Sequence, residues 1–306
     1  MDMNNFRRFL ELIGHRVIES DSCLWCEMAP RFYESIPFYR CQILSQTETQ
    51  ALFQSQRVLG LKFRVRPGIR GSKGCVYICE AKHYDLESLH PKMRNKVRQG
   101  LKYCEVKQID FDYLQKYGLP INQQTLTRHN RDDQLFSNPS NWARFCEAGK
   151  KVQGAMVWGS FYENQLAAYA VIFITGEYCN ILYQHSRTDL LHTKANNVLS
   201  YIMTKELMSL PDISYVSYGL RSIRGEQPGL DEYKTRLGYK HWPVNYIVVL
   251  NPILEHFLLN RTAYGSIDLM CKIFPNNDFL KRARGIVEIA KDSYIPGKRV
   301  PLASKG

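Results

Sequence analysis

The chain has 306 residues, of which 44% are hydrophobic, so it is long enough to bury a large core in one to three domains. It carries 41 lysines and arginines against 29 acidic residues, a formal net charge of +12. This excess favours an anionic partner, such as nucleic acid, a phosphate-rich co-substrate or a membrane surface, without choosing among them. No continuous apolar stretch is close to the length of about 20 residues that a membrane-spanning helix needs. The first ten residues also lack the apolar core of a signal peptide. We therefore expect a cytoplasmic protein with no transmembrane segment.

Nine cysteines are scattered through apolar, strand-like contexts. The spacing of Cys23 and Cys26 matches a CxxC pair, but no second pair or histidine couple completes a zinc set. We expect reduced, buried cysteines, no metal site and no bound cofactor.

The first third of the chain predicts a short amphipathic helix at 4–14, strands at 16–19 and 24–28, and a helix at 47–59. The aromatic segment 31–39, with prolines on either side of its centre, is expected to form a packed surface loop. A strand at 61–65 should place Leu61, Phe63 and Val65 inside. On the same pattern Lys62, Arg64 and Arg66 should face solvent, and another strand is expected at 75–80.

A basic segment follows, with proline at its second position as is usual at a helix start. Arg94, Arg98 and Lys102 recur at i, i+4 and i+8, so a helix would align three cations on one face. No acidic residue lies between Lys92 and Lys102. This basic patch is a candidate nucleic-acid or tRNA footprint, and the alternative is an ordinary solvated basic face.

The central region predicts helices around 111–127 and 142–149, then an antiparallel meander of strands at 155–162, 165–175 and 178–185. A helix at 193–208 and a strand at 213–220 complete a β-α-β unit. A strand that enters a helix through a short polar loop leaves unpaired N–H groups at the helix start, which suits an anion. A short helix ending at Gly238, a strand at 245–250 and several helices after Pro252 follow.

The order of these elements resembles the GNAT acyltransferase fold. The run from Tyr183 to Leu199, with the polar cluster Lys194-Ala195-Asn196-Asn197, resembles the fourth-strand, loop and helix segment of the FemAB branch. The segment from Pro228 to Tyr239 is similar to that branch's "GL..FK.R.GF" signature. The segment 89–99 looks like its basic helix. The resemblance covers roughly residues 85–250.

The resemblance implies an α/β protein with a GNAT-like mixed sheet flanked by helices. We expect two GNAT-like lobes in tandem. Segments 75–109 and 178–220 both have the order strand, helix and strand, and this weak similarity agrees with two diverged copies. The implied domains are a shortened lobe at 1–109, a catalytic lobe at 110–250 and a helical, basic extension at 251–306.

The implied activity is N-acyl transfer: an acyl or aminoacyl group moves from a thioester or ester donor onto an amine acceptor. Acyl-CoA is the expected co-substrate, and aminoacyl-tRNA or an acyl carrier protein are alternative donors. The chain departs from ordinary GNAT enzymes in one respect. It lacks their glycine-rich pyrophosphate loop, since no glycine lies between Gly176 and Gly219. The donor would therefore be held in a different way.

The resemblance also implies site residues. Lys234 stands where ordinary GNAT enzymes often have a general-acid tyrosine, and its neighbour Tyr233 is expected in the core. The candidate catalytic residues are Lys234, Tyr218 and His185, and the candidate donor-binding residues are Tyr183, Lys194, Asn196 and Asn197. Each has a structural alternative: a helix cap for 194–197, a solvated lysine, a histidine that only packs.

Arg221 and Arg224 follow the predicted fifth strand and would suit an anionic acceptor, or would be plain surface charge. A different class of function competes with the whole interpretation. A non-catalytic module could use the basic face of the same fold to hold nucleic acid.

Overall fold

The computed structural model describes residues 3–221, 228–259, 261–274 and 278–293. The chain forms two compact units. Unit 1 comprises Met1–Gly14 and Tyr77–His241, and unit 2 comprises His15–Val76 and Trp242–Gly306. The chain changes unit within two long strands, β5 (Ser72–Cys79) and β11 (Lys240–Leu250). These changes do not coincide with the predicted boundaries at residues 109 and 250.

The sheet of unit 1 is built on the predicted meander. Its strands are β6 (Cys104–Ile109), β7 (Ala155–Tyr162), β8 (Gln165–Thr175), β9 (Tyr178–Ser186) and β10 (Tyr215–Leu220). β6 to β9 are antiparallel neighbours in chain order, whereas β10 runs parallel to β9. The antiparallel meander and the β-α-β unit are thus confirmed.

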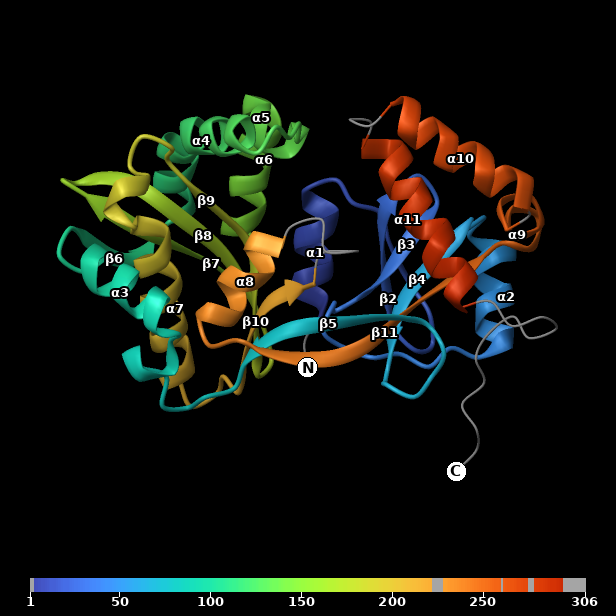
Figure 1. The fold of residues 1–306 in the computed structure, drawn as a ribbon, viewed down its shortest axis with the longest axis horizontal. Helices are drawn as coiled ribbons and strands as arrows, with labels where there is room; N and C mark the ends of the chain where they lie inside the picture. Colours follow the sequence, from blue (N-terminus) through green and yellow to red (C-terminus); the bar gives the residue numbers. More distant parts are fainter. Residues whose placement is uncertain (1–2, 222–227, 260, 275–277, 294–306) are drawn as a thin grey trace. The chain divides into compact units, whose positions relative to one another are not determined.

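Helices cover both faces of this sheet because β8, at its centre, is apolar on both sides. The helices of unit 1 are α1 (Asn4–Leu12), α3 (Pro91–Gly100), α4 (Phe111–Arg128), α5 (Gln134–Ser137), α6 (Pro139–Lys150), α7 (Ala195–Ser209) and α8 (Pro228–Arg236), with short 3₁₀ turns η1 (Leu86–Ser88) and η2 (Leu191–Thr193). Figure 1 shows α7 on one face of β7 to β9, and α4 with α6 on the other.

Unit 2 has its own core. Its strands β1 (Val17–Glu19), β2 (Leu24–Ala29), β3 (Phe32–Ile36) and β4 (Gly60–Val65) are neighbours in chain order, and β11 pairs with β4. Its helices are α2 (Gln46–Ser55), α9 (Pro252–Leu258), α10 (Arg261–Ile273) and α11 (Asp278–Ser293). Trp25 and Phe63, with ring centroids 6.2 Å apart, lie at the centre of an apolar cluster.

Two predictions about unit 2 were wrong. Segment 31–39 is not a surface loop, because it contains β3, which pairs with both β2 and β4 and buries Tyr33 and Ile36. Arg64 does not face solvent. Its side chain is fully buried, and its Nη1 lies 2.5 Å from Glu34 Oε1 on the adjacent strand.

That ion pair explains why the alternating pattern failed in β4. Burial would raise the pKa of Glu34, but the positive charges of Lys62 and Arg64 outweigh this effect and hold the pKa below its ordinary value. A buried arginine is tolerated because its charge has a partner.

The architecture is therefore an α/β protein with a mixed sheet flanked by helices and a helical C-terminal region, as predicted. Within the described ranges, no helix has the length and apolarity needed to cross a bilayer.

Candidate active site at the end of the β9–β10 ladder

The parallel ladder between β9 and β10 is short. It joins Tyr178 to Tyr215 and ends at Asn180 and Ser217, although β9 runs on to Ser186 and β10 to Leu220. All of these residues are described. Gly219, with φ of +77°, adopts a left-handed conformation near the end of β10. The carboxyl ends of two neighbouring parallel strands, unpaired with each other, are where α/β folds usually bind ligands.

A polar network joins the two strands beyond the end of the ladder. Tyr218 on β10 donates its hydroxyl hydrogen to Oε1 of Gln184 on β9. Nε2 of Gln184 donates to Asn196 Oδ1 at 2.8 Å and to Ser200 Oγ at 2.7 Å. Asn196 and Ser200 are one turn apart on α7, so both present their side chains to Gln184.

Tyr233 of α8 completes this network. Its hydroxyl donates to the Asn196 carbonyl at 3.1 Å and lies 2.9 Å from Ser200 Oγ. Burial raises the pKa of Tyr233 to about 12 and that of Tyr218 well above its ordinary value. Both tyrosines therefore keep their protons at neutral pH and can serve as proton donors.

Lys234 lies next to the network and is only 4% exposed. Its Nζ donates to the Leu220 carbonyl at 3.0 Å and stands 4.8 Å from the centre of the Tyr77 ring and 5.5 Å from that of Tyr218. Aromatic faces and a carbonyl stabilise a cation. Lys234 is thus not a solvated surface lysine, and it places a fixed positive charge at the end of β10.

The structure separates two of the predicted site residues from this network. Tyr183 and His185 alternate with Gln184 along β9, so they face the opposite side of the sheet. Their rings lie 4.7 Å and 4.9 Å from that of Phe136 in α5. Burial, and then the nearby positive charges of α4 and the turn after it, lower the pKa of His185 to about 4.

The beginning of α7 meets the end of the basic helix α3. A Cβ at Gly100 would lie 2.3 Å from Val198 Cγ2 and 3.2 Å from Lys194 Cβ, so only glycine permits this approach. Asn197 Nδ2 contacts Met93 Sδ at 3.1 Å. The predicted basic patch and the predicted donor-binding cluster are therefore one region, which the sequence alone did not show.

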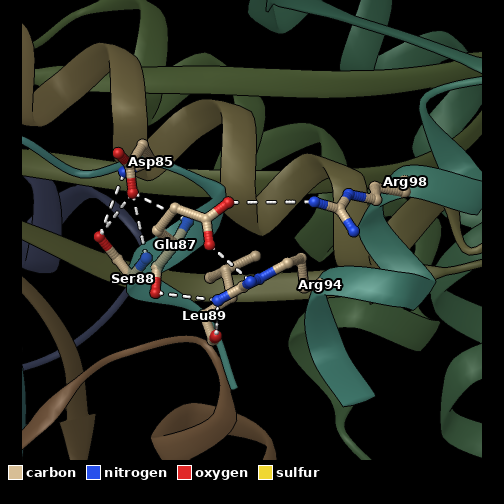
Figure 2. Close-up of polar contacts among 6 residues, drawn as sticks. All are labelled: Asp85, Glu87, Ser88, Leu89, Arg94 and Arg98. Atoms are coloured by element: carbon tan, nitrogen blue, oxygen red, sulfur yellow. Dashed lines mark hydrogen bonds and ion pairs between the residues drawn. The ribbon is translucent and has the colours of Figure 1, made fainter. Parts of the chain in front are cut away.

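Figure 2 shows how the cations of α3 are held. Arg94 pairs with Glu87 of η1 at 2.5 Å and donates to the Leu89 carbonyl at 3.3 Å, so it stabilises the fold locally. Arg98 is 54% exposed and 3.9 Å from Glu87. Lys102 is exposed and lies past the end of α3. The predicted row of three cations therefore becomes two exposed ones.

The predicted acceptor arginines are less informative. Arg221 is exposed, with its Nε 3.8 Å from Asp231 Oδ2. Arg224 lies outside the described residues.

Sequence reasoning missed Gln184 and Ser200, and it assigned Tyr233 to the core only. A signal was present for Ser200, which follows Asn196 by one helical turn. Nothing in the local sequence distinguishes Gln184 from any polar residue on a strand.

Comparisons with known proteins concern the fold. No model of a known protein family matches the chain, and no curated protein matches its sequence. Solved structures do match. The C-terminal domain of a putative lysylphosphatidylglycerol synthetase from Agrobacterium fabrum is 12% identical with a TM-score of 0.59, covering 87% of this chain and 91% of that one.

Two further structures agree with the first. FemX is 13% identical with a TM-score of 0.58, covering 82% of this chain and 92% of its own. L-PGS from Bacillus licheniformis is 12% identical with a TM-score of 0.53, covering 83% and 93%. The chain has a GNAT-like fold of the FemX type. At this level of identity the likeness concerns the GNAT-like fold, and the chemistry has to be argued from the residues.

Proposed function

We propose that this chain is an N-acyltransferase that moves an acyl or aminoacyl group from a thioester or ester donor onto an amine. The observation that carries the proposal is the end of the β9–β10 ladder at Asn180 and Ser217, with two protonated tyrosines and a buried lysine gathered beside it. Solved structures of similar fold include FemX and the C-terminal domain of a putative lysylphosphatidylglycerol synthetase.

The donor would be held where α3 meets α7. Lys194, Arg98 and Lys102 bring positive charge to the beginning of α7, and a helix amino terminus itself attracts anions. Side-chain cations would thus replace the missing glycine-rich loop. This arrangement suits a phosphate-bearing donor, either acyl-CoA, aminoacyl-tRNA or the phosphopantetheine arm of an acyl carrier protein.

The transfer step needs a polarised donor carbonyl, a deprotonated amine and a proton for the leaving group. The amine nitrogen attacks the donor carbonyl carbon, a C–N bond forms, and negative charge develops on the carbonyl oxygen near the Lys234 cation. The C–S or C–O bond of the donor then breaks. Tyr218 gives its proton to the departing sulfur or oxygen, and Gln184 holds the tyrosine hydroxyl in place. The proton lost by the amine then replaces the one that Tyr218 has given up, and His185, which faces the other side of β9, takes no part in this step.

Calorimetric titration tests the proposal directly. The full chain is titrated with acetyl-CoA, a long-chain acyl-CoA and an aminoacyl-tRNA, and at least one should bind and support transfer to an amine. Failure of all three to bind would sink the proposal. The Lys205→Gln variant, whose charge change lies on the exposed far end of α7, should bind as the unmodified chain does and serves as the matched control.

The exposed cations Arg98 and Lys102 also favour the second candidate, a non-catalytic nucleic-acid-binding module. Such binding should weaken steeply with salt. The two functions separate at Lys234, whose replacement should abolish acyl transfer and leave nucleic-acid binding unchanged.

A further inference from the structure

The surface where α3 ends carries large apolar side chains that the fold leaves exposed. α3 ends at Gly100, and the turn after it holds Leu101 and Tyr103, which are 42% and 52% exposed. Leu191, in η2 just before α7, is 44% exposed. A single exposed leucine needs no explanation, but several large apolar side chains that lie together indicate a surface used for contact.

These side chains belong to one surface because the turn after α3 packs against η2. A Cβ at Gly100 would lie 3.1 Å from the Thr193 carbonyl oxygen and 3.2 Å from Lys194 Cβ, so the two backbones are in close contact. Cys104 Sγ lies 3.8 Å from the same carbonyl oxygen, although the two residues are 89 positions apart in the sequence. The turn and η2 therefore form one continuous surface of unit 1.

Positive charge borders the apolar side chains. Five lysines and arginines occur from Lys92 to Lys102, with no acidic residue among them. The Arg98 side chain is 54% exposed, Lys102 is exposed and Lys194 is half-buried. The nearby acidic side chains each have a neighbour that holds them: Asp189 has Arg187, Glu87 has Arg94 and Glu163 has Tyr162. We call the following residues the docking surface: Arg98, Leu101, Lys102, Tyr103, Leu191 and Lys194.

The composition of the docking surface favours a protein partner over a nucleic acid. Surfaces that bind nucleic acids are polar and positive, and they use aromatic and arginine side chains to stack on bases. Protein interfaces instead combine an apolar centre with a charged or polar rim. Two exposed leucines beside a row of cations match the second pattern, and the positive sign of the rim is complementary to an acidic protein.

The size of the docking surface indicates a short-lived contact. A stable complex buries about 800 Å² on each partner, which takes about 20–30 residues a side. Six residues make a smaller contact, of the kind found in transient encounters. The partner should therefore be a protein that binds and leaves again at each turnover.

The docking surface is continuous with the polar network at the end of the β9–β10 ladder. Lys194 and Asn196 are two positions apart at the beginning of α7, and Asn196 Oδ1 accepts a hydrogen bond from Gln184 at 2.8 Å. Gln184 in turn accepts the hydrogen of the Tyr218 hydroxyl. The first turn of α7 is thus part of both, and a donor group on a flexible arm has only this turn to pass between the surface and Tyr218.

We propose that the docking surface receives an acidic carrier protein, which presents the acyl donor as a thioester on a phosphopantetheine arm. The inference rests on the transfer reaction proposed above and selects one of its donors. The leucines and the tyrosine meet an apolar part of the carrier, and the cations pair with its carboxylates and with the phosphate of the arm. The amine attacks the thioester carbon, the C–S bond breaks, Tyr218 protonates the sulfur, and the carrier leaves with a free thiol.

The first test measures binding without chemistry. A purified acyl carrier protein is titrated into the full chain as the apo form, which lacks the arm, and as the acetyl-loaded form, with acetyl-CoA and a deacylated tRNA in parallel. The apo form should bind through the docking surface alone. The acetyl-loaded form should bind at least about tenfold more tightly than acetyl-CoA, and its affinity should fall as salt is added. Equal affinities for these two donors, or tighter binding of tRNA than of the carrier, would overturn the proposal.

The second test changes the apolar part of the docking surface. Leu101 and Leu191 are exposed, so the double variant Leu101→Ser, Leu191→Ser should keep the fold, which circular dichroism checks. Its affinity for the apo carrier should fall at least about tenfold. Leu210→Ser, at a leucine 44% exposed at the other end of α7, is the matched control and should bind the carrier as the unmodified chain does. Equal affinities in the double variant and the control would contradict the docking surface.

These measurements separate the docking surface from the proposed function. Carrier binding with no acyl transfer to an amine from the loaded carrier, acetyl-CoA or aminoacyl-tRNA would refute acyl transfer and leave the docking surface standing. Transfer from acetyl-CoA by a chain that does not bind the carrier would refute the docking surface and leave the proposed function standing.

Discussion

The two faces of β9 differ in how their polar atoms are satisfied. On the α7 face, Gln184 bonds to Tyr218, Asn196 and Ser200, so each partner in the network holds another. On the α4 face, the His185 Nδ1 and the Asn122 Nδ2 lack partners among the described residues. A network that completes itself fixes a geometry before any ligand arrives, whereas unsatisfied groups are ready to bind one.

The α7 face is thus organised by the protein itself, whereas the α4 face keeps polar atoms without a partner among the described residues. This distinction fails if the α7 network is dispensable, and it becomes quantitative once the contribution of each face to stability and turnover is measured. The following experiments are ordered from the largest expected effect to the smallest.

Lys234→Met should cause the largest loss. The change removes the cation beside Tyr218 but keeps the length of the side chain, so turnover should fall about 100-fold or more. Steady-state kinetics measure the loss, and circular dichroism with a thermal melt should show that the fold is kept. Lys240→Met, at a lysine 67% exposed, is the control. Unchanged kinetics in Lys234→Met would remove this residue from the site.

The pKa of His185 predicts a pH-dependent stability. In the folded protein it is about 4, against an ordinary 6.5, so between these values the unfolded chain binds the extra proton. The free energy of unfolding should therefore be highest above pH 6.5, fall as the pH drops toward 4, and change no further from this cause below 4. The total is about 3 kcal/mol.

Urea unfolding from pH 4 to pH 7 measures this effect. The His185→Gln variant cannot take up the proton and should lack this part of the dependence. Parallel curves for the two proteins would show that His185 is not held neutral by its surroundings.

The third experiment compares the two faces directly. Gln184→Leu removes the amide that Tyr218, Asn196 and Ser200 share and should lower the free energy of unfolding by about 2 kcal/mol. Asn122→Leu removes an unsatisfied amide as well as the partner of Tyr169, so these effects should largely cancel. Denaturant titration of both variants decides the matter. If both variants lost the same free energy of unfolding, the two faces would not differ in this respect.

The smallest expected effect concerns the donor end of the α7 face. The double variant Arg98→Gln, Lys102→Gln should raise the KM for a phosphate-bearing donor a few-fold, and its affinity should depend less on salt. Lys205→Gln is the control on the same helix pair. A KM that does not change, measured from 50 to 200 mM salt as is usual for such interactions, would place the donor phosphates elsewhere.

Much of the fold could be predicted from the sequence because it depends on local patterns. The long apolar strand β8, the helix α7 and the signature from Pro228 to Tyr239 were each sufficient to indicate their elements. Burial that depends on a distant partner could not be predicted. Arg64 has the spacing of a solvent-facing residue, and only Glu34, thirty positions away on another strand, explains its burial.

The site follows the same rule. Lys194 and Asn196 were predicted from a contiguous motif, and the structure brings Asn196 into contact with Gln184. The network around Gln184 brings together β9, β10, α7 and α8, and its members are separated by up to 49 positions between Gln184 and Tyr233. No period or motif in the sequence expresses such a meeting.

The short helix α1 has a consequence for how the protein is made. Phe6 and Phe9 pack on Phe173, with ring centroids 4.9 Å and 5.6 Å apart. At ordinary rates of synthesis the ribosome takes roughly ten to thirty seconds to travel from the first of these residues to the last. During that interval the two phenylalanines lack this partner, although the first part of unit 2, His15–Val76, has already been made. A nascent chain of this kind would benefit from a chaperone that shields its early apolar segment.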